Sequence, residues 1–213
     1  MTACSRNAVA AEYARLAGGY DAKSSFYIKA TTRETLARLF LRPQDRVLDI
    51  GCGTGALLQR LCAIHPPPQL CGVDPVFEML AMARRELSST VDLRQGWAER
   101  LPFADAQFDV VVSCSVFHYL YRPDKALTEI LRVLRPGGQL VITDWSSDYL
   151  MCRLLDRYLQ LTGRAHSRVY RAQEHVERVE SAGFATVDVD QYKINWLWGL
   201  ITARFARTRV KSI

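Results

Sequence analysis

RVLDIGCGTGALLQRL, residues Arg46–Leu61, is the stretch of sequence that decides the fold. An apolar run leads into glycines at Gly51, Gly53 and Gly55, and a segment with helix-like apolar spacing follows. Strand, glycine turn and helix in this order are typical of the first unit of a sheet of parallel strands. Glycines in such a turn permit unusual backbone angles and let a ligand approach the main chain closely. The turn is therefore predicted to hold a ligand at the end of the first strand.

The spacing of the glycines separates three classes of ligand. A phosphate-binding loop of the GxxxxGK[ST] type needs a lysine, and the segment after Gly55 supplies none. A dinucleotide loop needs GxGxxG, whereas the third glycine here comes one residue early. Asp49 stands just before the first glycine, where a carboxylate repels a pyrophosphate and attracts a cation. The loop therefore argues against NAD and against a nucleoside triphosphate.

The rest of the chain alternates between predicted strands and helices. The strands are near-continuous apolar runs, which indicates a parallel sheet covered by helices on both faces. The fold class predicted is therefore α/β and doubly wound. Further strands are expected at 69–74, 91–96, 108–116, 138–145, 184–194 and 196–206, and helices at 55–64, 76–88, 123–134, 149–161 and 171–182.

Four segments resemble one known family. VLDIGCGTG at 47–55 is similar to motif I of the class I S-adenosylmethionine (SAM) methyltransferases, and VDP at 73–75 is similar to the end of that family's second strand. Residues 97–120 and 129–145 resemble its fourth and fifth strands with their flanking segments. The resemblance covers about 46–145. It implies a Rossmann-like, mostly parallel seven-stranded sheet, SAM as cofactor and S-adenosylhomocysteine as product.

The chemistry of SAM suits the residues of this stretch. Asp49 can attract the ammonium group, and Asp74 at a strand end can accept hydrogen bonds from the ribose hydroxyls. Pro75 offers an apolar wall for adenine, while Ala98 and Glu99 flank its other side. The structural alternatives are a simple turn for the glycines and a helix N-cap for Asp74. The expected cofactor-binding residues are Tyr20, Asp49, Gly51, Cys52, Gly53, Gly55, Asp74, Pro75, Ala98, Glu99 and Ser113.

The acceptor is expected near the end of the fourth strand, where the sequence reads SCSVFHYL. His118 is the ionisable residue there, either as a general base or substrate anchor or as a packing histidine of the family's xxHxL pattern. No [DN]PP[FY] segment occurs, so nucleic acid is not expected as a partner. A small-molecule pocket is predicted from Tyr27, Asp144, Trp145, Asp148, His166 and Tyr170, against the alternative of a solvated loop and helix cap.

The whole chain sets broader limits. Its 213 residues suit one domain, with a helical N-terminal lid at 1–40, a SAM-binding core at 46–145 and a substrate side at 146–213. Net charge is +6 and dispersed. No sustained apolar segment indicates a signal peptide or membrane insertion, and the six cysteines show no pairing pattern, so a cytoplasmic protein is expected.

The function predicted is SAM-dependent methylation of a small molecule, as in the ubiquinone/menaquinone-type enzymes that the sequence resembles. The protein is expected to be a monomer or homodimer without a metal. An RNA or protein methyltransferase and a catalytically silent SAM-fold partner are the alternatives. The C-terminal NWLWGLITARFARTRVK combines tryptophan with arginine, which suits either a membrane contact or an ordinary edge strand.

Overall fold

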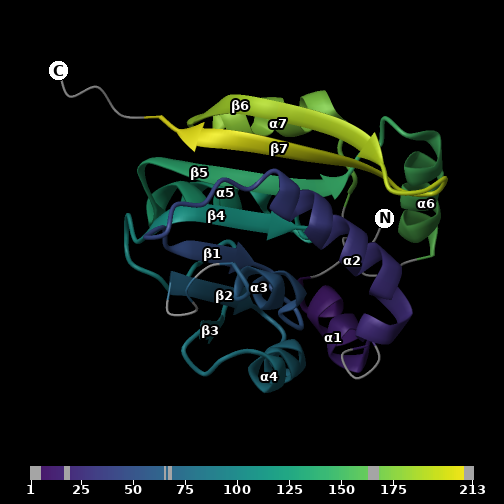
Figure 1. The fold of residues 1–213 in the computed structure, drawn as a ribbon. Helices are drawn as coiled ribbons and strands as arrows, with labels where there is room; N and C mark the ends of the chain where they lie inside the picture. Colours follow the sequence, from purple (N-terminus) through teal and green to yellow (C-terminus); the bar gives the residue numbers. More distant parts are fainter. Residues whose placement is uncertain (1–5, 17–19, 65, 67–68, 163–167, 209–213) are drawn as a thin grey trace.

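A seven-stranded sheet forms the centre of the computed structural model, which describes residues 6–16, 20–64, 66, 69–162 and 168–208 (Figure 1). The strand order is β3-β2-β1-β4-β5-β7-β6. The strands are β1 (Val47–Ile50), β2 (Leu70–Asp74), β3 (Asp92–Gln95), β4 (Phe108–Cys114), β5 (Leu134–Trp145), β6 (Phe184–Lys193) and β7 (Gly199–Arg207). The helices are α1 (Arg6–Leu16), α2 (Tyr20–Ala37), α3 (Ala56–Leu61), α4 (Phe77–Glu86), α5 (Pro123–Val133), α6 (Leu150–Leu161) and α7 (Ala172–Ser181), with a 3-10 helix at Phe117–Tyr119.

The first five strands run parallel, and β7 joins them as an antiparallel strand. β1 lies at the centre, where Val47 pairs with Leu70 of β2 and Val110 of β4. β7 pairs antiparallel with both β5 and β6. The carboxyl ends of the parallel strands therefore meet at one edge of the sheet. The prediction of a Rossmann-like, mostly parallel seven-stranded sheet is confirmed.

Alternate residues of the central strands supply two hydrophobic cores. Val47 and Val110 point to the face covered by α3 and α4, and they pack with side chains such as Leu58. Leu48 and Val111 point to the opposite face and pack against α5 and α7. Figure 1 shows α2 and α3 in front of the sheet and α5 and α7 behind it. Burial on both faces explains why these strands read as unbroken apolar runs.

Two of the differences from the predicted boundaries have a clear physical reason. β5 begins at Leu134, earlier than expected, because Leu134 pairs with Phe108 before an irregular register leads to the regular ladder at Val110. The predicted break at the Pro-Gly-Gly segment is thus absorbed as an irregularity within the strand. The 3-10 helix at Phe117–Tyr119 was not predicted, since three residues are too few for a periodic signal.

The two N-terminal helices cover the edge of the sheet where the parallel strands end (Figure 1). Tyr13 of α1 meets Tyr119 edge to face, with ring centroids 5.4 Å apart. Tyr13 also packs on Val76 and Met79 at the start of α4. Thr35 of α2 donates to the Thr143 hydroxyl at 2.8 Å. Among the helices described, none has the length and apolar character needed to cross a membrane.

Candidate functional site

A cavity lies at the carboxyl ends of β1, β2 and β4, beneath α1 and α2. This is the edge at which open parallel sheets bind their ligands. The glycine turn forms its floor and aromatic side chains form much of its wall. Its lining includes Tyr13, Tyr27, Thr31, Thr32, Asp49, Gly51, Cys52, Gly53, Thr54, Asp74, Pro75, Val76, Met79, Trp97, Ala98, Glu99, Ser115, Tyr119 and Tyr121.

The glycine turn is held in a shape that few other residues could adopt. Gly51 and Gly53 have φ angles of 65° and 52°, in the left-handed region. The Gly51 N–H donates to the Val73 carbonyl at 2.7 Å, which ties the turn to the end of β2. A Cβ on Gly51 would lie 2.5 Å from Cγ2 of Val116, whereas a Cβ on Gly53 would meet nothing within 4 Å. Gly51 is thus required for packing, and Gly53 leaves open space for a ligand.

Two buried carboxylates stand beside this turn. Asp74 accepts the Gly53 N–H at 2.9 Å and the Val76 N–H at 2.8 Å, so it holds the turn and the start of α4 together. Burial raises the pKa of Asp74 to about 6, although the two N–H donors favour its ionised form. Burial also raises the pKa of Asp49 well above its ordinary value, and the nearby Asp74 charge raises it further.

These two carboxylates form an electrostatic site for a cation. None of the ion pairs among the described residues includes Asp49 or Asp74. Uncompensated burial of negative charge is unfavourable, and a bound positive group offsets it. A ligand with a positive group beside Asp49 and hydroxyls beside Asp74 therefore fits this part of the cavity.

A chain of hydrogen bonds forms the opposite wall. Tyr27 of α2 lies 2.8 Å from the Ser115 hydroxyl, oxygen to oxygen, and the indole N–H of Trp145 donates to the Tyr27 oxygen. An indole can only donate, so the Tyr27 proton is free to be donated to Ser115. The Ser115 proton can then be offered to an acceptor atom in the cavity. Burial raises the pKa of Tyr27 well above its ordinary value, so it acts as a phenol and not as a phenolate.

His118 lies behind the cavity wall and does not line it. Its Nδ1 is 2.6 Å from an oxygen of Asp144, and its backbone N–H donates to the other oxygen at 3.0 Å. Its ring stacks on Trp145, with centroids 4.7 Å apart. Burial alone would raise the pKa of Asp144, but the His118 partner lowers it below its ordinary value, so Asp144 is ionised. The pair anchors the 3-10 helix that carries Tyr119 into the cavity.

The structure brings most of the predicted cofactor residues together and leaves others apart. The predicted residues that line the cavity are Tyr27, Asp49, Gly51, Cys52, Gly53, Asp74, Pro75, Ala98 and Glu99. The predicted residues outside its lining are Gly55, Ser113, His118, Asp144, Trp145, Asp148 and Tyr170. His166 lies outside the described residues, and of Tyr20 only its place at the start of α2 is described.

Physical reasons account for the residues that lie apart from the cavity. Tyr170 is buried against Phe117 and His175 in the core behind the sheet. Asp148 accepts the Ala172 N–H at 2.8 Å and so caps the start of α7. Gly55 is the N-cap of α3 and packs against α4. Of the residues predicted to contact the substrate, Tyr27 is therefore the one that lines the cavity among those the structure describes.

Several residues that line the cavity were missed by the sequence analysis, among them Tyr13, Thr31, Ser115 and Tyr119. Tyr13 and Thr31 come from α1 and α2, whose position over the sheet is set by tertiary packing that no local pattern encodes. Tyr119 follows His118 directly, and the prediction for this segment considered only the ionisable His118. Ser115 carried a signal only in its place after the fourth strand, and the structure gives it a φ of 60°, uncommon for a residue other than glycine.

The fold resembles that of the class I SAM-dependent methyltransferases, and the comparisons with known proteins show the same likeness. A family model described as a methyltransferase domain matches residues 48–142. That segment runs from the start of β1 to within β5, and it contains the glycine turn, Asp74 and Glu99. The family resemblance stated from the sequence is confirmed.

Relatives and solved structures agree with this class. An uncharacterised methyltransferase of Mycobacterium tuberculosis is 36% identical over 137 residues, 64% of this chain and 53% of the relative. The malonyl-[acyl-carrier protein] O-methyltransferase of Methylococcus capsulatus is 31% identical over 151 residues, 70% of this chain and 54% of the relative. This chain therefore spans about half the length of the curated relatives that it matches.

A solved structure extends the likeness to the whole fold. The proposed methyltransferase in complex with the Haloferax volcanii Trm112 activator superimposes with a TM-score of 0.82, covering 93% of this chain and 98% of that one. Its sequence identity is 22%, so this likeness concerns the fold alone.

Proposed function

We propose that the protein transfers a methyl group from SAM to a small-molecule acceptor. The observation that carries this proposal is the pair of buried carboxylates, Asp49 and Asp74, beside the open space at Gly53. The cavity offers negative charge at one end, hydrogen-bond acceptors next to it and an apolar wall beyond. These features correspond to the ammonium, the ribose hydroxyls and the adenine of SAM.

The residues present fit this cofactor. In the proposed complex Asp49 attracts the ammonium group, and the Asp74 oxygens, which also accept the Gly53 and Val76 N–H groups, accept the ribose hydroxyls. Pro75 and Ala98 flank the adenine on its two faces. Cys52 and Tyr20 remain proposed contacts at the glycine turn and the start of α2. When bound, SAM supplies an electrophilic methyl group, and the protein contributes positioning and exclusion of water.

The acceptor is proposed to lie against Tyr27 and Ser115. Their hydroxyls offer a hydrogen-bond donor within an otherwise aromatic wall that includes Tyr13, Tyr119 and Tyr121. Such a wall suits a compact apolar molecule that carries an oxygen able to accept a hydrogen bond. Because α1 packs on α4 over the cavity, a small acceptor fits better than a base within a folded nucleic acid.

His118 is proposed as a positioning residue in place of a general base. The base role predicted from the sequence requires contact with the acceptor, whereas His118 is buried and bonded to Asp144 behind the wall. In this arrangement it fixes Tyr119, and Asp144 and Trp145 support the substrate wall from behind. Asp144 and Trp145 of β5 are thus proposed to support the wall and not to contact the substrate directly.

Calorimetric titration with SAM and S-adenosylhomocysteine tests the proposal. Asp49→Asn is expected to weaken SAM binding, since it removes the charge that faces the ammonium. Asp109→Asn is the matched control, because Asp109 is the second residue of β4, at the opposite edge of the sheet, and pairs with Arg135. A labelled-methyl screen over small acceptors then tests transfer. Absence of SAM binding by the unmodified protein, or binding of NADH in its place, would overturn the proposal.

A further inference from the structure

The outer face of α6 carries an apolar stripe that the fold leaves in solvent. Leu150, Leu154, Tyr158 and Leu161 are 59%, 49%, 54% and 87% exposed. Their spacing of four, four and three residues places them on one side of the helix. Apolar residues scattered singly on a surface are ordinary, but a contiguous row of them marks an interaction surface.

The opposite face of α6 already supplies the contacts that hold the helix in place. Leu155 and Leu159 pack with Trp145 and Trp198. Cys152 is fully buried, and its Sγ atom lies 3.6 Å from the carbonyl oxygen of Leu197. The core therefore does not need the exposed stripe.

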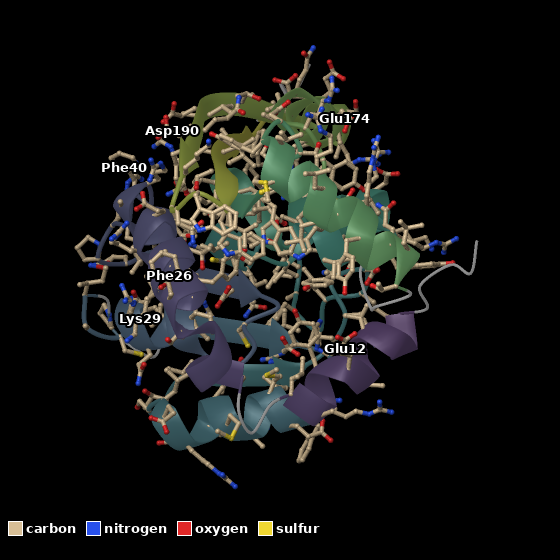
Figure 2. The ribbon with its side chains drawn as sticks, turned by 90° about the vertical axis from the view of Figure 1, so that its right-hand side faces the viewer. Glu12, Phe26, Lys29, Phe40, Glu174 and Asp190 are labelled. Carbon is tan, nitrogen blue, oxygen red and sulfur yellow. The ribbon has the colours of Figure 1, made fainter. Side chains whose placement is uncertain are left out.

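An exposed tryptophan lies in the segment that contacts α6. The segment between β6 and β7 is tied to α6 through Cys152, and its Trp196 is 73% exposed. Figure 1 shows α6 beside this turn, at the edge of the sheet where the parallel strands end. Figure 2 faces this edge, with Phe26 of α2 and Glu12 of α1 labelled on it. α6 and the turn before β7 thus lie at the edge of the sheet that also carries the cavity.

The charged side chains of α6 that reach solvent are basic. Arg153 and Arg157 belong to α6, and none of the ion pairs among the described residues includes either. Lys193 at the end of β6 is exposed next to the same turn. The single carboxylate of α6, Asp156, is buried and accepts the Val169 N–H. The helix therefore presents apolar side chains and positive charge without an exposed acid.

We propose that this surface, formed by Leu150, Leu154, Tyr158, Leu161 and Trp196 with its basic rim, docks on an anionic lipid bilayer. An amphipathic helix with basic flanks and an exposed tryptophan binds where acyl chains meet negative headgroups. Two copies of the surface brought together would place arginines near arginines, so charge complementarity favours the bilayer over a second copy. The proposal is independent of methyl transfer, because it rests on α6 and Trp196 alone.

Vesicle co-sedimentation of the full chain tests this surface. We expect the protein to pellet with vesicles of phosphatidylglycerol and phosphatidylcholine mixed equally, to remain in solution with phosphatidylcholine alone, and to be released by salt. Leu154→Glu and Leu161→Glu are each expected to lower the partition coefficient about tenfold, the effect of withdrawing one leucine from an apolar contact. Arg157→Gln is expected to lower it about fivefold.

Matched controls separate the surface from general effects. Val187→Glu alters a comparably exposed side chain in the first half of β6, and Arg60→Gln alters an exposed arginine of α3. Both should bind vesicles as the unmodified protein does. Circular dichroism melts check that each variant folds, as expected for exposed positions.

Three outcomes would overturn the proposal. The first is that the unmodified protein fails to pellet with the anionic vesicles. The second is that Leu161→Glu pellets as well as the Val187→Glu control. The third is that sedimentation velocity finds a dimer which Leu161→Glu converts to a monomer, because the stripe would then be an interface between copies of this chain.

Discussion

Replacing Asp74 by asparagine should change stability and cofactor binding in opposite directions at neutral pH. The carboxyl group is buried, and its pKa is about 6 in the folded protein against 3.8 for an ordinary aspartate. Folding is therefore opposed whenever the group is ionised. The penalty is absent below pH 3.8, grows between pH 3.8 and about 6, and is complete above that. A shift of about two pKa units corresponds to about 3 kcal/mol.

Asparagine removes the charge but cannot satisfy both of the backbone donors. Asp74 accepts one N–H from Gly53 and one from Val76 on different oxygens. An amide has one oxygen, so one donor loses its acceptor, at a cost of about 1–3 kcal/mol. At pH 4 only this loss acts, and Asp74→Asn should be the less stable protein. At pH 8 the relief of about 3 kcal/mol offsets the loss, and the variant should equal or exceed the unmodified protein.

Urea unfolding at pH 4 and pH 8 measures this reversal, and calorimetry measures the functional effect. In the proposed complex the lost acceptor faces a ribose hydroxyl, so SAM affinity should fall about tenfold to a hundredfold. Asp49 lies nearby, and the Asp74 charge contributes to its raised pKa. In the variant the pKa of Asp49 therefore falls, which adds to the gain in folding stability at pH 8. If the free energies of unfolding of the two proteins keep a constant difference across this pH range, the burial argument is wrong. Unchanged SAM affinity would refute the ribose contact.

Four further substitutions test other parts of the site. Gly53→Ala should fold, with a strain of about 1 kcal/mol from its left-handed φ, but should bind SAM poorly. Gly51→Ala should be strongly destabilised by collision with Val116. Thermal melts and calorimetry distinguish the two variants, and equal behaviour would contradict the packing role of Gly51 and the ligand space at Gly53. Tyr27→Phe should raise the acceptor KM and leave SAM affinity unchanged, which steady-state kinetics and titration check; a loss of SAM affinity would place Tyr27 on the cofactor instead. His118→Ala should lower the free energy of unfolding by about 3 kcal/mol, because it leaves Asp144 charged and buried, yet reduce turnover per folded molecule less than the roughly hundredfold loss expected for a general base.

The sheet and the cofactor side of the site were predictable because their signals are local. A buried strand, the turn at Gly51–Gly55 and the following helix occupy consecutive residues. Asp74 ends the neighbouring strand, so the rule that parallel strands share one carboxyl edge places it beside the turn. The structure ties these parts together through the Asp74 bond to Gly53 and the Gly51 bond to Val73.

The acceptor side was less predictable because its contacts join distant parts of the chain. Tyr27 and Ser115 are 88 residues apart, and their contact depends on how α2 crosses the sheet. α2 shows little separation of apolar and polar faces in its sequence, YDAKSSFYIKATTRETLA, so its docking could not be oriented in advance. Tyr170 is aromatic and close in sequence to predicted pocket residues, but it packs against Phe117 and His175 and is therefore part of the hydrophobic core.

Asp144 shows why an ionisable side chain near a predicted site need not act on the substrate. It is the second-to-last residue of β5, next to β4. Its carboxylate accepts the His118 backbone N–H and the Trp145 backbone N–H and also pairs with the His118 ring. Through His118 it fixes the turn that carries Tyr119, and through Trp145 it supports the indole that donates to Tyr27. Two walls of the cavity thus depend on one buried charge outside it. A histidine and an aspartate that follow adjacent parallel strands at the same edge are therefore as well placed to bond each other as to reach a ligand. Burial of both side chains decides in favour of the mutual bond.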